Sequence, residues 1–376
     1  MPLRETITSS WNHIQGFLFP LLREEVGPLS YQHERLVIVL DMAGIEAFRL
    51  MSLGSPGRPQ EDRYALARAF VAKMVLNLPT TSSLIDRLRV DATLRRLCGW
   101  ISVRRLPSES TFSRAFAEFA ATSFPNQVHE ALIKRTFKDS IVGHISRDST
   151  AIETRQKPVK VEKPDIVKRK RGRPRKDAEI VLPQPRRLAR QRDQTLSQML
   201  ADLPTACGVG GKRNAKGHIT HWIGYKLHID TADGDIPISC LLTSAALHDS
   251  QAAIPLANMT ASRVTNLYDL MDSAYDAPEI LEHSRSLGHV PIIDANPRRD
   301  GKEAIEIENR ARKTANYALA EATRYNQRSS SERVNSNLKD NCCGKQVRVR
   351  GADKVFCHLM FGVLVITVEQ IMRLVT

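Results

Sequence analysis

The sequence predicts an α/β protein, in which a mixed sheet flanked by helices follows an all-α N-terminal domain. Three observations lead to this prediction. Residues 1–140 carry apolar residues at helical spacing, residues 141–376 alternate short strand patterns with helical ones, and a strongly basic stretch interrupts the second part at about 155–218. The chain has 376 residues, of which 42% are hydrophobic, so it is long enough for two domains with real cores.

The first part contains three amphipathic helix patterns, at 62–78, 82–100 and 108–124. In the third, one face collects the apolar residues Phe112, Ala115, Phe116, Phe119 and Ala120. Short helices joined by Pro79 and Pro107 are compatible with a helix-turn-helix bundle, so we expect residues 1–140 to be a DNA-binding domain. A helical domain that only packs is the alternative.

The second part opens with a strand pattern at 141–148. Residues 224–243 predict two strands joined at Asp233-Gly234, a residue pair typical of tight hairpin turns. The further elements expected are, in order, a helix capped by Asp249, a strand at 266–272, a helix near 277–287, a strand at 289–294, a long helix at about 302–339 and a last helix at about 353–374.

The charge is strongly positive and unevenly spread. Lysine and arginine total 55 against 41 acidic residues, and residues 155–192 alone hold 15 basic and 4 acidic residues. Such an excess favours a polyanionic partner, nucleic acid first and an anionic membrane surface second. The N-terminus lacks the apolar stretch of a secretory signal, and the most apolar run, Val355–Val368, is too short for a typical membrane span. We therefore expect a cytoplasmic protein with no membrane partner.

The basic stretch has the composition of a flexible insertion, with prolines and almost no aromatic residues. Its core, residues 168–176, reads KRKRGRPRK. This core resembles the AT-hook, whose arginines lie along a narrow A·T-rich minor groove on either side of a glycine. The resemblance implies that Arg171, Gly172, Arg173 and Pro174 contact DNA. A nonspecific basic linker is the alternative.

Three acidic residues stand out by their position. Asp148 ends the first strand, Asp272 ends another, and Glu332 lies on the long helix. A carboxylate at a strand end points into the crevice where open sheets bind ligands. Converging carboxylates repel one another unless cations lie between them, and such oxygen ligands suit Mg²⁺ or Mn²⁺. Two ions about 3.5–4 Å apart activate an attacking water or 3′-hydroxyl in phosphodiester chemistry. Singly, the three acids also fit a turn residue, a helix cap and a surface residue.

Tyr325, Arg328, Glu332 and Lys339 are separated by three, four and seven positions, so an α-helix places them on one narrow stripe. A carboxylate, two cations and a phenol cannot form a core face, which leaves a solvated face or a site. The spacing resembles the Y-R-E-K signature of bacterial insertion-sequence transposases with DDE chemistry. Further similar stretches are RDSTAIETRQKP and ERVNSNLK, and LPSESTFSRAFAEF in the first part resembles the N-terminal domain that often precedes them.

The resemblance implies a ribonuclease-H-like catalytic domain over 141–376, in which Asp148, Asp272 and Glu332 hold two Mg²⁺ ions, with Mn²⁺ as a substitute. It implies that the other three residues of the signature contact double-stranded DNA, at element ends and target, and that a nucleoid-associated homodimer joins two ends. In one respect the chain departs from the family, because its long gap lies between the first and second acids instead of the second and third.

Lys226 is a further candidate for DNA contact. It lies beside Trp222 and Tyr225, whose rings can stack on an extruded base. Packing of both rings at the start of a strand is the alternative.

The sequence therefore predicts a DNA transposase that cuts the ends of its element and transfers the 3′-hydroxyl into target DNA. A DNA-binding regulator or architectural protein derived from a transposase, with the catalytic role lost, is the first alternative. A nuclease without transfer activity is the second.

Overall fold

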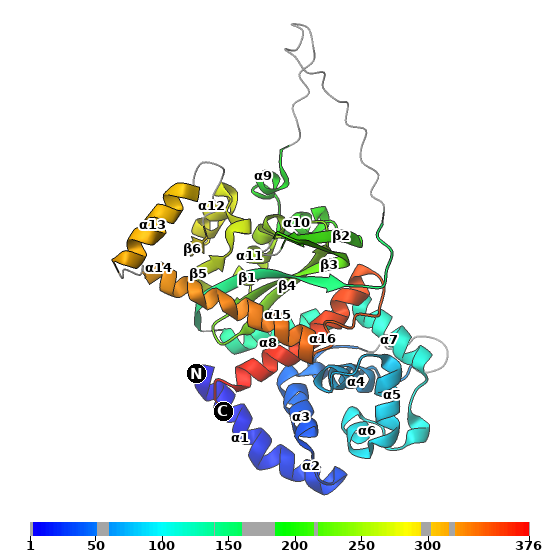
Figure 1. The fold of residues 1–376 in the computed structure, drawn as a ribbon. Helices are drawn as coiled ribbons and strands as arrows, with labels where there is room; N and C mark the ends of the chain where they lie inside the picture. Colours follow the sequence, from blue (N-terminus) through cyan, green and yellow to red (C-terminus); the bar gives the residue numbers. More distant parts are fainter. Residues whose placement is uncertain are drawn as a thin grey trace.

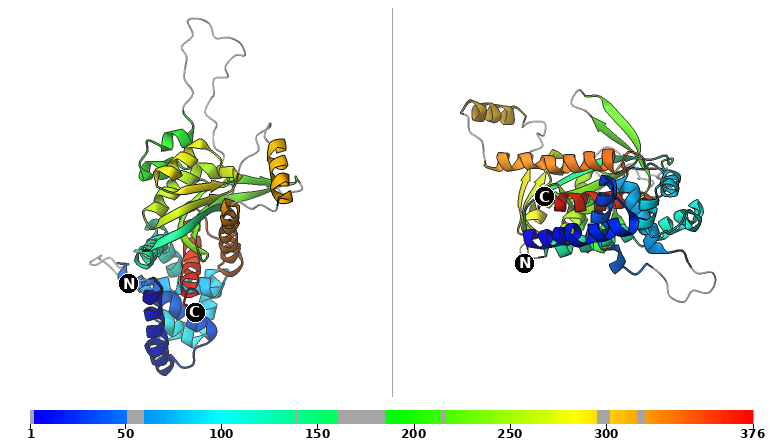
Figure 2. Two further views of the ribbon diagram at one scale, coloured as in Figure 1. Left: turned by 90° about the vertical axis from the view of Figure 1, so that its left-hand side faces the viewer. Right: turned by 90° about the horizontal axis from the view of Figure 1, so that it is seen from below.

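The computed structural model describes residues 3–50, 60–138, 140–159, 185–213, 217–294, 302–315 and 320–375. The sheet and its covering helices form the upper half of the molecule in Figure 1, and the N-terminal helices lie below them. The last helix, α16, runs between the two halves, so the first and last thirds of the chain share one core (Figures 1 and 2).

The N-terminal part is helical, as predicted. Its elements are α1 (Leu3–His13), η1 (Ile14–Leu18), α2 (Phe19–Val26), α3 (Tyr31–Ala43), η2 (Ile45–Ala47), α4 (Arg63–Val75), α5 (Thr81–Val90), α6 (Ala92–Cys98), η3 (Val103–Arg105), α7 (Glu109–Ala121) and α8 (Phe124–Phe137). The single helix expected at 82–100 is two helices, because the Asp91 side chain accepts a hydrogen bond from the backbone N–H of Leu94 and starts α6.

The sheet has six strands, β1 (Ile141–Glu153), β2 (Gly208–Arg213), β3 (Ile219–Ala232), β4 (Ile236–Ser244), β5 (Thr265–Met271) and β6 (Val290–Ile293). The order is β2-β3-β1-β5-β6, and β4 pairs with β3. Strand β1 is antiparallel to β3 and parallel to β5, which is parallel to β6. The predicted mixed sheet and the β3–β4 hairpin at Asp233-Gly234 are thus confirmed, and the fold class is that of a ribonuclease-H-like domain.

The helices of the second part are α9 (Arg187–Gln191), α10 (Leu196–Asp202), η4 (Asp249–Ala252), α11 (Ala253–Ala261), η5 (Ser273–Tyr275), α12 (Pro278–Ser286), α13 (Lys302–Thr314), α14 (Ala320–Tyr325), η6 (Asn326–Arg328), α15 (Ser329–Asn341) and α16 (Ala352–Met372). Helix α11 packs against β3 and β4, with α9, α10 and α12 around it. Helices α15 and α16 cover the opposite face, where α15 crosses β1 and β3 (Figure 1).

Two expectations differ from the structure. The long helix at 302–339 is divided, with a 3-10 turn (η6) directly before α15. Part of the stretch expected to be flexible, residues 185–213, forms α9, α10 and β2. Met199 and Leu203 anchor this part, since both are buried in apolar clusters beside α11. The sequence pattern does not indicate these two apolar contacts, because the surrounding stretch is highly charged. The domain boundaries themselves stay a prediction.

Helix α16 fills the centre of the molecule. It packs against α3, α4, α7, α8 and β4, and its Phe361 ring lies 5.8 Å from Phe70 and 6.3 Å from Phe119, measured between centroids. Among the described helices, only α16 is long and apolar enough to cross a membrane, and 89% of its most apolar window is buried inside the protein. The expectation of a packed helix over Val355–Val368 therefore agrees with its burial.

Replacing Phe361 by alanine should destabilise the whole chain, because the ring joins the N-terminal helices to the helix that covers the sheet. We expect a loss of about 3–5 kcal/mol in the free energy of unfolding, measured by urea denaturation. Val90→Ala is the matched control, since Val90 is 80% exposed, and it should change stability by less than about 0.5 kcal/mol. Equal effects of the two variants would contradict the central role of α16.

Candidate functional site

The parallel pairing of β1 with β5 places two predicted acids next to each other. The last paired residues are Arg147 and Met271, so Asp148 and Asp272 follow at the same level of adjacent strands. Arg147 and Met271 also touch, at 3.4 Å from Nη1 to Sδ. Because side chains alternate along a strand, both aspartates point to the other face, the one that α15 covers. Strand β1 continues to Glu153, so Asp148 directly follows the end of the pairing with β5 but, contrary to the prediction from the sequence, does not end the strand.

Asp148 is a carboxyl group whose charge is disfavoured. Burial, together with the nearby carboxylate of Asp272, raises its pKa to about 6, although a backbone hydrogen bond from Ser149 and the charges of Arg328 and Lys212 act in the opposite direction. Asn335 of α15 donates a hydrogen bond from Nδ2 to Asp148 Oδ2 at 3.2 Å. A raised pKa beside a second carboxylate is the arrangement that a bound cation relieves.

Asn335 is a site residue that the sequence reasoning missed. It lies three positions after Glu332 and four before Lys339, so it belongs to the same helical stripe, and this spacing was the available signal. Its side chain is buried, and its Oδ1 has no hydrogen-bond partner among the described residues.

The stripe itself is present, although a 3-10 turn interrupts it. The guanidinium of Arg328 lies 5.8 Å from the centre of the Tyr325 ring, and its Nη2 lies 2.6 Å from Glu332 Oε1. The Glu332 side chain is 57% exposed and pairs with Arg328. Asp272 uses its Oδ1 to accept the Ala274 N–H at 2.9 Å, which caps η5 and leaves its other oxygen for a ligand.

Two lysines complete the charged surroundings of Asp148. Lys212 of β2 lowers the pKa of Asp148, and Lys339 of α15 is in turn influenced by the charges of Lys212 and Asp148. Lys212 was not among the expected site residues, because nothing in the local sequence shows that the β2–β3 hairpin brings it near α15.

The opposite face of β1 carries a second set of polar groups. Lys226 Nζ contacts Leu247 O and Asp249 Oδ1, each at 2.8 Å, and its side chain is largely buried. The expectation that Asp249 caps a helix is wrong, because Asp249 is the first residue of η4 and its carboxylate binds Lys226 and the Ser149 hydroxyl instead. The aromatic neighbours of Lys226, Trp222 and Tyr225, are buried, which agrees with packing; DNA contact by Lys226 stays a prediction.

A buried ion pair lies directly behind the aspartates. Arg147 binds both oxygens of Asp230, at 2.8 and 2.7 Å, and both side chains are almost fully buried. Thr260 of α11 donates a third hydrogen bond to this carboxylate at 2.7 Å. Removing one partner of such a pair is costly because the other charge is left buried, so the pair fixes the chain next to Asp148.

The described residues include no group of three or more His, Cys, Asp or Glu side chains placed to hold a metal ion. The donors at the site nonetheless fit a divalent cation. They are the carboxylates of Asp148 and Asp272, the orphaned Oδ1 of Asn335 and, one helical turn away, Glu332. All are oxygen ligands of the kind that Mg²⁺ and Mn²⁺ prefer.

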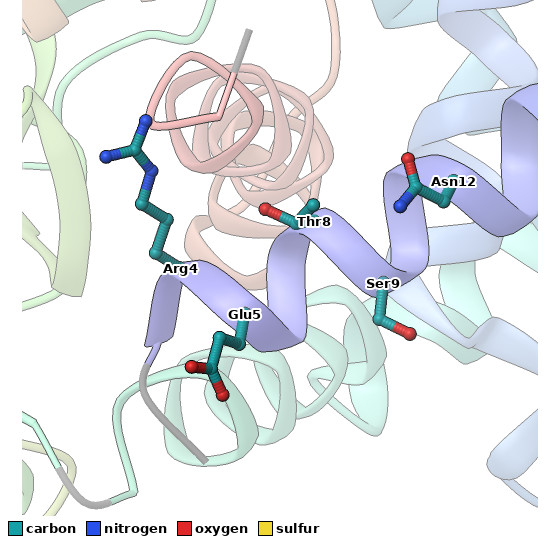
Figure 3. A pocket seen from close by; sticks show the side chains of 5 residues that line it. All are labelled: Arg4, Glu5, Thr8, Ser9 and Asn12. Carbon is teal, nitrogen blue, oxygen red and sulfur yellow. The ribbon is translucent and has the colours of Figure 1, made fainter.

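Two other features lie apart from this site. Arg171, Gly172, Arg173 and Pro174, together with the whole core 168–176, lie outside the described residues. A depression on α1 is lined by polar side chains of that one helix, as Figure 3 shows, and it is remote from β1 and β5 (Figure 1).

Comparison with known protein families gives two matches. The family described as "Transposase DDE domain" matches residues 145–368, which is more than half of the chain and includes Asp148, Asp272 and the stripe of α15. The family described as "Transposase domain (DUF772)" matches residues 31–118, within the N-terminal helices. No curated protein and no solved structure matches the chain.

The raised pKa of Asp148 predicts a pH-dependent change in stability. The folded state holds the proton up to about pH 6, whereas the ordinary value is 3.8, so ionisation of Asp148 destabilises the fold as the pH rises between these values. Asp148→Asn, without metal, should therefore be more stable than wild type at pH 8, by up to about 3 kcal/mol.

This gain should vanish below about pH 4. Urea unfolding in EDTA over this pH range measures it. Asp86→Asn is the control, since the Asp86 side chain is 65% exposed and, among the described residues, forms an ion pair only with exposed Arg89. A stability difference for Asp148→Asn that does not vary with pH would contradict the assigned environment.

Proposed function

This chain belongs to the DDE transposases, and we propose that it cleaves DNA at the ends of its element and joins the freed 3′-hydroxyl to target DNA. The observation that carries the proposal is the pair of adjacent carboxylates, Asp148 and Asp272, facing a helix that presents Glu332. A transposase acts on DNA, and the net charge of +14 suits that partner. As an enzyme of this family it is expected to use a divalent metal ion.

We assign Asp148, Asp272 and Glu332 as the ligands of two Mg²⁺ ions, which Mn²⁺ can replace. Bound there, the metal ions supply Lewis-acid activation of the attacking oxygen and stabilisation of the leaving oxygen. The protein holds the carboxylates in place through the β1–β5 pairing, the Asn335 contact to Asp148 and the buried Arg147 ion pair. The raised pKa of Asp148 supports this role, because a bound cation removes the cost of its charge.

Glu332 has to exchange partners to take part. In the structure its carboxylate pairs with Arg328, its neighbour four residues earlier. Exposed ion pairs at this spacing contribute only about 0.3–0.5 kcal/mol to stability, so breaking the Arg328–Glu332 pair costs little free energy. Once released, Arg328 can bind a DNA phosphate, together with Lys339 and the phenol of Tyr325, because a guanidinium presents two parallel donors to phosphate oxygens.

The remaining parts of the chain take supporting roles in this proposal. The helical domain of residues 1–140 recognises element ends, and residues 168–176 bind A·T-rich minor grooves through Arg171 and Arg173. A homodimer on DNA brings two ends together. Lys226 is paired with Asp249 in the structure, so its DNA contact requires that pair to open.

Replacing any of the three acids by alanine should abolish cleavage and leave DNA binding largely intact. We expect a loss of about a thousandfold or more in cleavage rate with Mg²⁺, because the metal ions lose a ligand. EDTA should stop the wild-type reaction and Mn²⁺ should restore it. The measurement is cleavage of a duplex that spans the junction between the element and its flanking DNA, with Asp86→Ala as the matched carboxylate control.

Each alternative function has its own outcome in this assay. A variant of Asp148, Asp272 or Glu332 that cleaves near the wild-type rate would refute the assignment of that residue. Binding without metal-dependent cleavage by the wild type would favour the regulatory protein. The Arg328–Glu332 ion pair is compatible with that alternative, because it occupies the carboxylate of Glu332. Joining of a pre-cut end to a second DNA molecule would exclude a simple nuclease.

The hook-like core predicts a preference for A·T-rich DNA. Changing Arg171 and Arg173 together to alanine should remove this preference, since their side chains are the proposed minor-groove contacts. Competition between A·T-rich and G·C-rich duplexes at raised salt measures it. Lys168→Ala/Lys170→Ala removes the same charge and is the matched control. Equal loss in both double variants would indicate a nonspecific basic linker instead.

A further inference from the structure

The polar side of helix α7 has no part in the site beside Asp148. The stretch LPSESTFSRAFAEF, residues 106–119, leads into α7 and forms most of it, and its three phenylalanines are buried in the core. Thr111, Arg114 and Glu118 follow one another at intervals of three and four positions, so they share a different side of the helix. This side lines a surface depression, and α7 lies on the right of the N-terminal helices in Figure 1.

The depression has a volume of about 820 Å³ and is strongly charged. The residues around the start of α4, the turn η3 and the polar side of α7 form it together. Of the described residues that line it, only Leu106 and Pro107 are apolar. The charged residues of the lining are four arginines and two glutamates, which give it a net charge of +2: Arg63, Arg104, Arg105, Arg114, Glu61 and Glu118.

A buried arginine neutralises one of the two acids. Arg63 donates from Nε and Nη2 to the two carboxylate oxygens of Glu118, at 2.7 and 2.8 Å, and is only 6% exposed. This ion pair joins α4 to α7 and fixes the polar side of α7 in place. Because the carboxylate of Glu118 is paired through both oxygens, it repels an anion in the depression less than a free carboxylate does.

The other three arginines have no acidic partner among the described residues. Arg104 and Arg105 are exposed, and their side chains form no hydrogen bond or ion pair within that part of the chain. Arg114 Nη2 contacts only Thr111 Oγ1, at 3.4 Å, and this hydroxyl lies 3.2 Å from Ser108 Oγ. The depression therefore presents three guanidinium groups and two hydroxyls, which are the side-chain donors that phosphate oxygens accept.

The chemistry of this surface fits DNA better than an acidic protein. The centre of a protein–protein interface is apolar and poor in charged residues, whereas protein–DNA interfaces are more polar and much more positively charged. A lining with only two apolar residues and three arginines without acidic partners belongs to the second kind. A duplex also offers several phosphates in succession, so that each arginine can bind one of them.

We propose that Arg104, Arg105 and Arg114 bind the phosphate backbone of a DNA duplex in this depression. The inference rests on the proposed function, in which the helical domain of residues 1–140 recognises element ends, and it assigns a DNA contact to one surface of that domain. Phosphate contacts fix the position of a protein on a duplex but do not read its sequence. The depression therefore anchors the duplex, and other groups of the chain select the element end.

The test measures DNA binding by Arg114→Ala and by Arg104→Ala/Arg105→Ala in the full-length chain. The probe is the duplex that spans the junction between the element and its flanking DNA, with EDTA present so that binding is measured without cleavage. The slope of log Kd against log salt should decrease by about 0.9 in the single variant and about 1.8 in the double variant, because each arginine neutralises one phosphate. An unrelated duplex of the same length should give the same decreases, since phosphate contacts are independent of sequence.

Control variants separate a phosphate contact from a general loss of charge or of structure. Arg104→Lys/Arg105→Lys keeps both charges and should keep the slope near wild type. Arg4→Ala and Arg4→Ala/Arg23→Ala remove the same charge from α1 and α2, where both side chains are exposed, and should also leave the slope near wild type. All variants should unfold at the urea concentration of wild type, because the replaced arginines are exposed.

The outcomes separate this inference from the proposed function. An unchanged slope in both alanine variants, with a wild type that cleaves in Mg²⁺, would overturn only the inference. Equal decreases in the α1 and α2 controls would show an effect of net charge and would overturn it as well. Decreases confined to the junction duplex would overturn the phosphate contact in favour of base reading. Failure of the wild type to cleave any junction duplex would overturn the proposed function, whereas the salt slopes would still decide whether the depression binds DNA.

Discussion

The repulsion between Asp148 and Asp272 is the constraint on which the site depends. Parallel pairing of β1 with β5 leaves both carboxylates on one face at the same level, and burial raises the pKa of Asp148 to about 6. Two carboxylates that repel each other stay adjacent only where other interactions of the folded chain compensate their repulsion. Here Asn335 binds Asp148 from above, and the buried Arg147–Asp230 pair fixes the strand from behind. In the proposed function, the unfavourable charge of the two carboxylates in the free protein is the source of the affinity for a divalent cation.

Helix α15 lies over this pair, and in the proposed function it connects the pair to DNA. Glu332, Asn335 and Lys339 lie on one stripe of α15, and Arg328 of η6 precedes them, which gives two cations, a carboxylate and an amide within four helical turns. In the structure the carboxylate of Glu332 is held by Arg328. In the proposed function a substrate phosphate takes Arg328 and a metal ion takes Glu332, so both partners favour the opening of this ion pair. Helix α16 supports α15 from below and joins it to the N-terminal helices, which makes the catalytic face and the N-terminal domain parts of one core.

The positive charge that acts on the site comes from elements that lie far apart in the sequence. The basic stretch at 155–192 holds much of the positive charge of the sequence, yet the cations that act on the charge of Asp148, Arg328 and Lys212, come from η6 and from β2. Lys212 shows why local sequence is a poor guide here. It lies in a glycine-rich hairpin that is distant from Asp148 along the chain, and only the pairing of β2 with β3, which also pairs with β1, brings it near enough to act on the charge of that carboxylate.

The sequence by itself determined the helical first part, the mixed sheet, the Asp233-Gly234 hairpin and the family, because periodicity, turn residues and spaced motifs are local properties. It also indicated the stripe with Glu332, since helical spacing is fixed by 3.6 residues per turn. Only the tertiary structure decided that Asp148 adjoins Asp272, that Asn335 binds Asp148, and that Asp249 binds Lys226 instead of capping a helix. These contacts connect residues remote in the chain, and strand pairing and burial, which no local pattern encodes, bring them together.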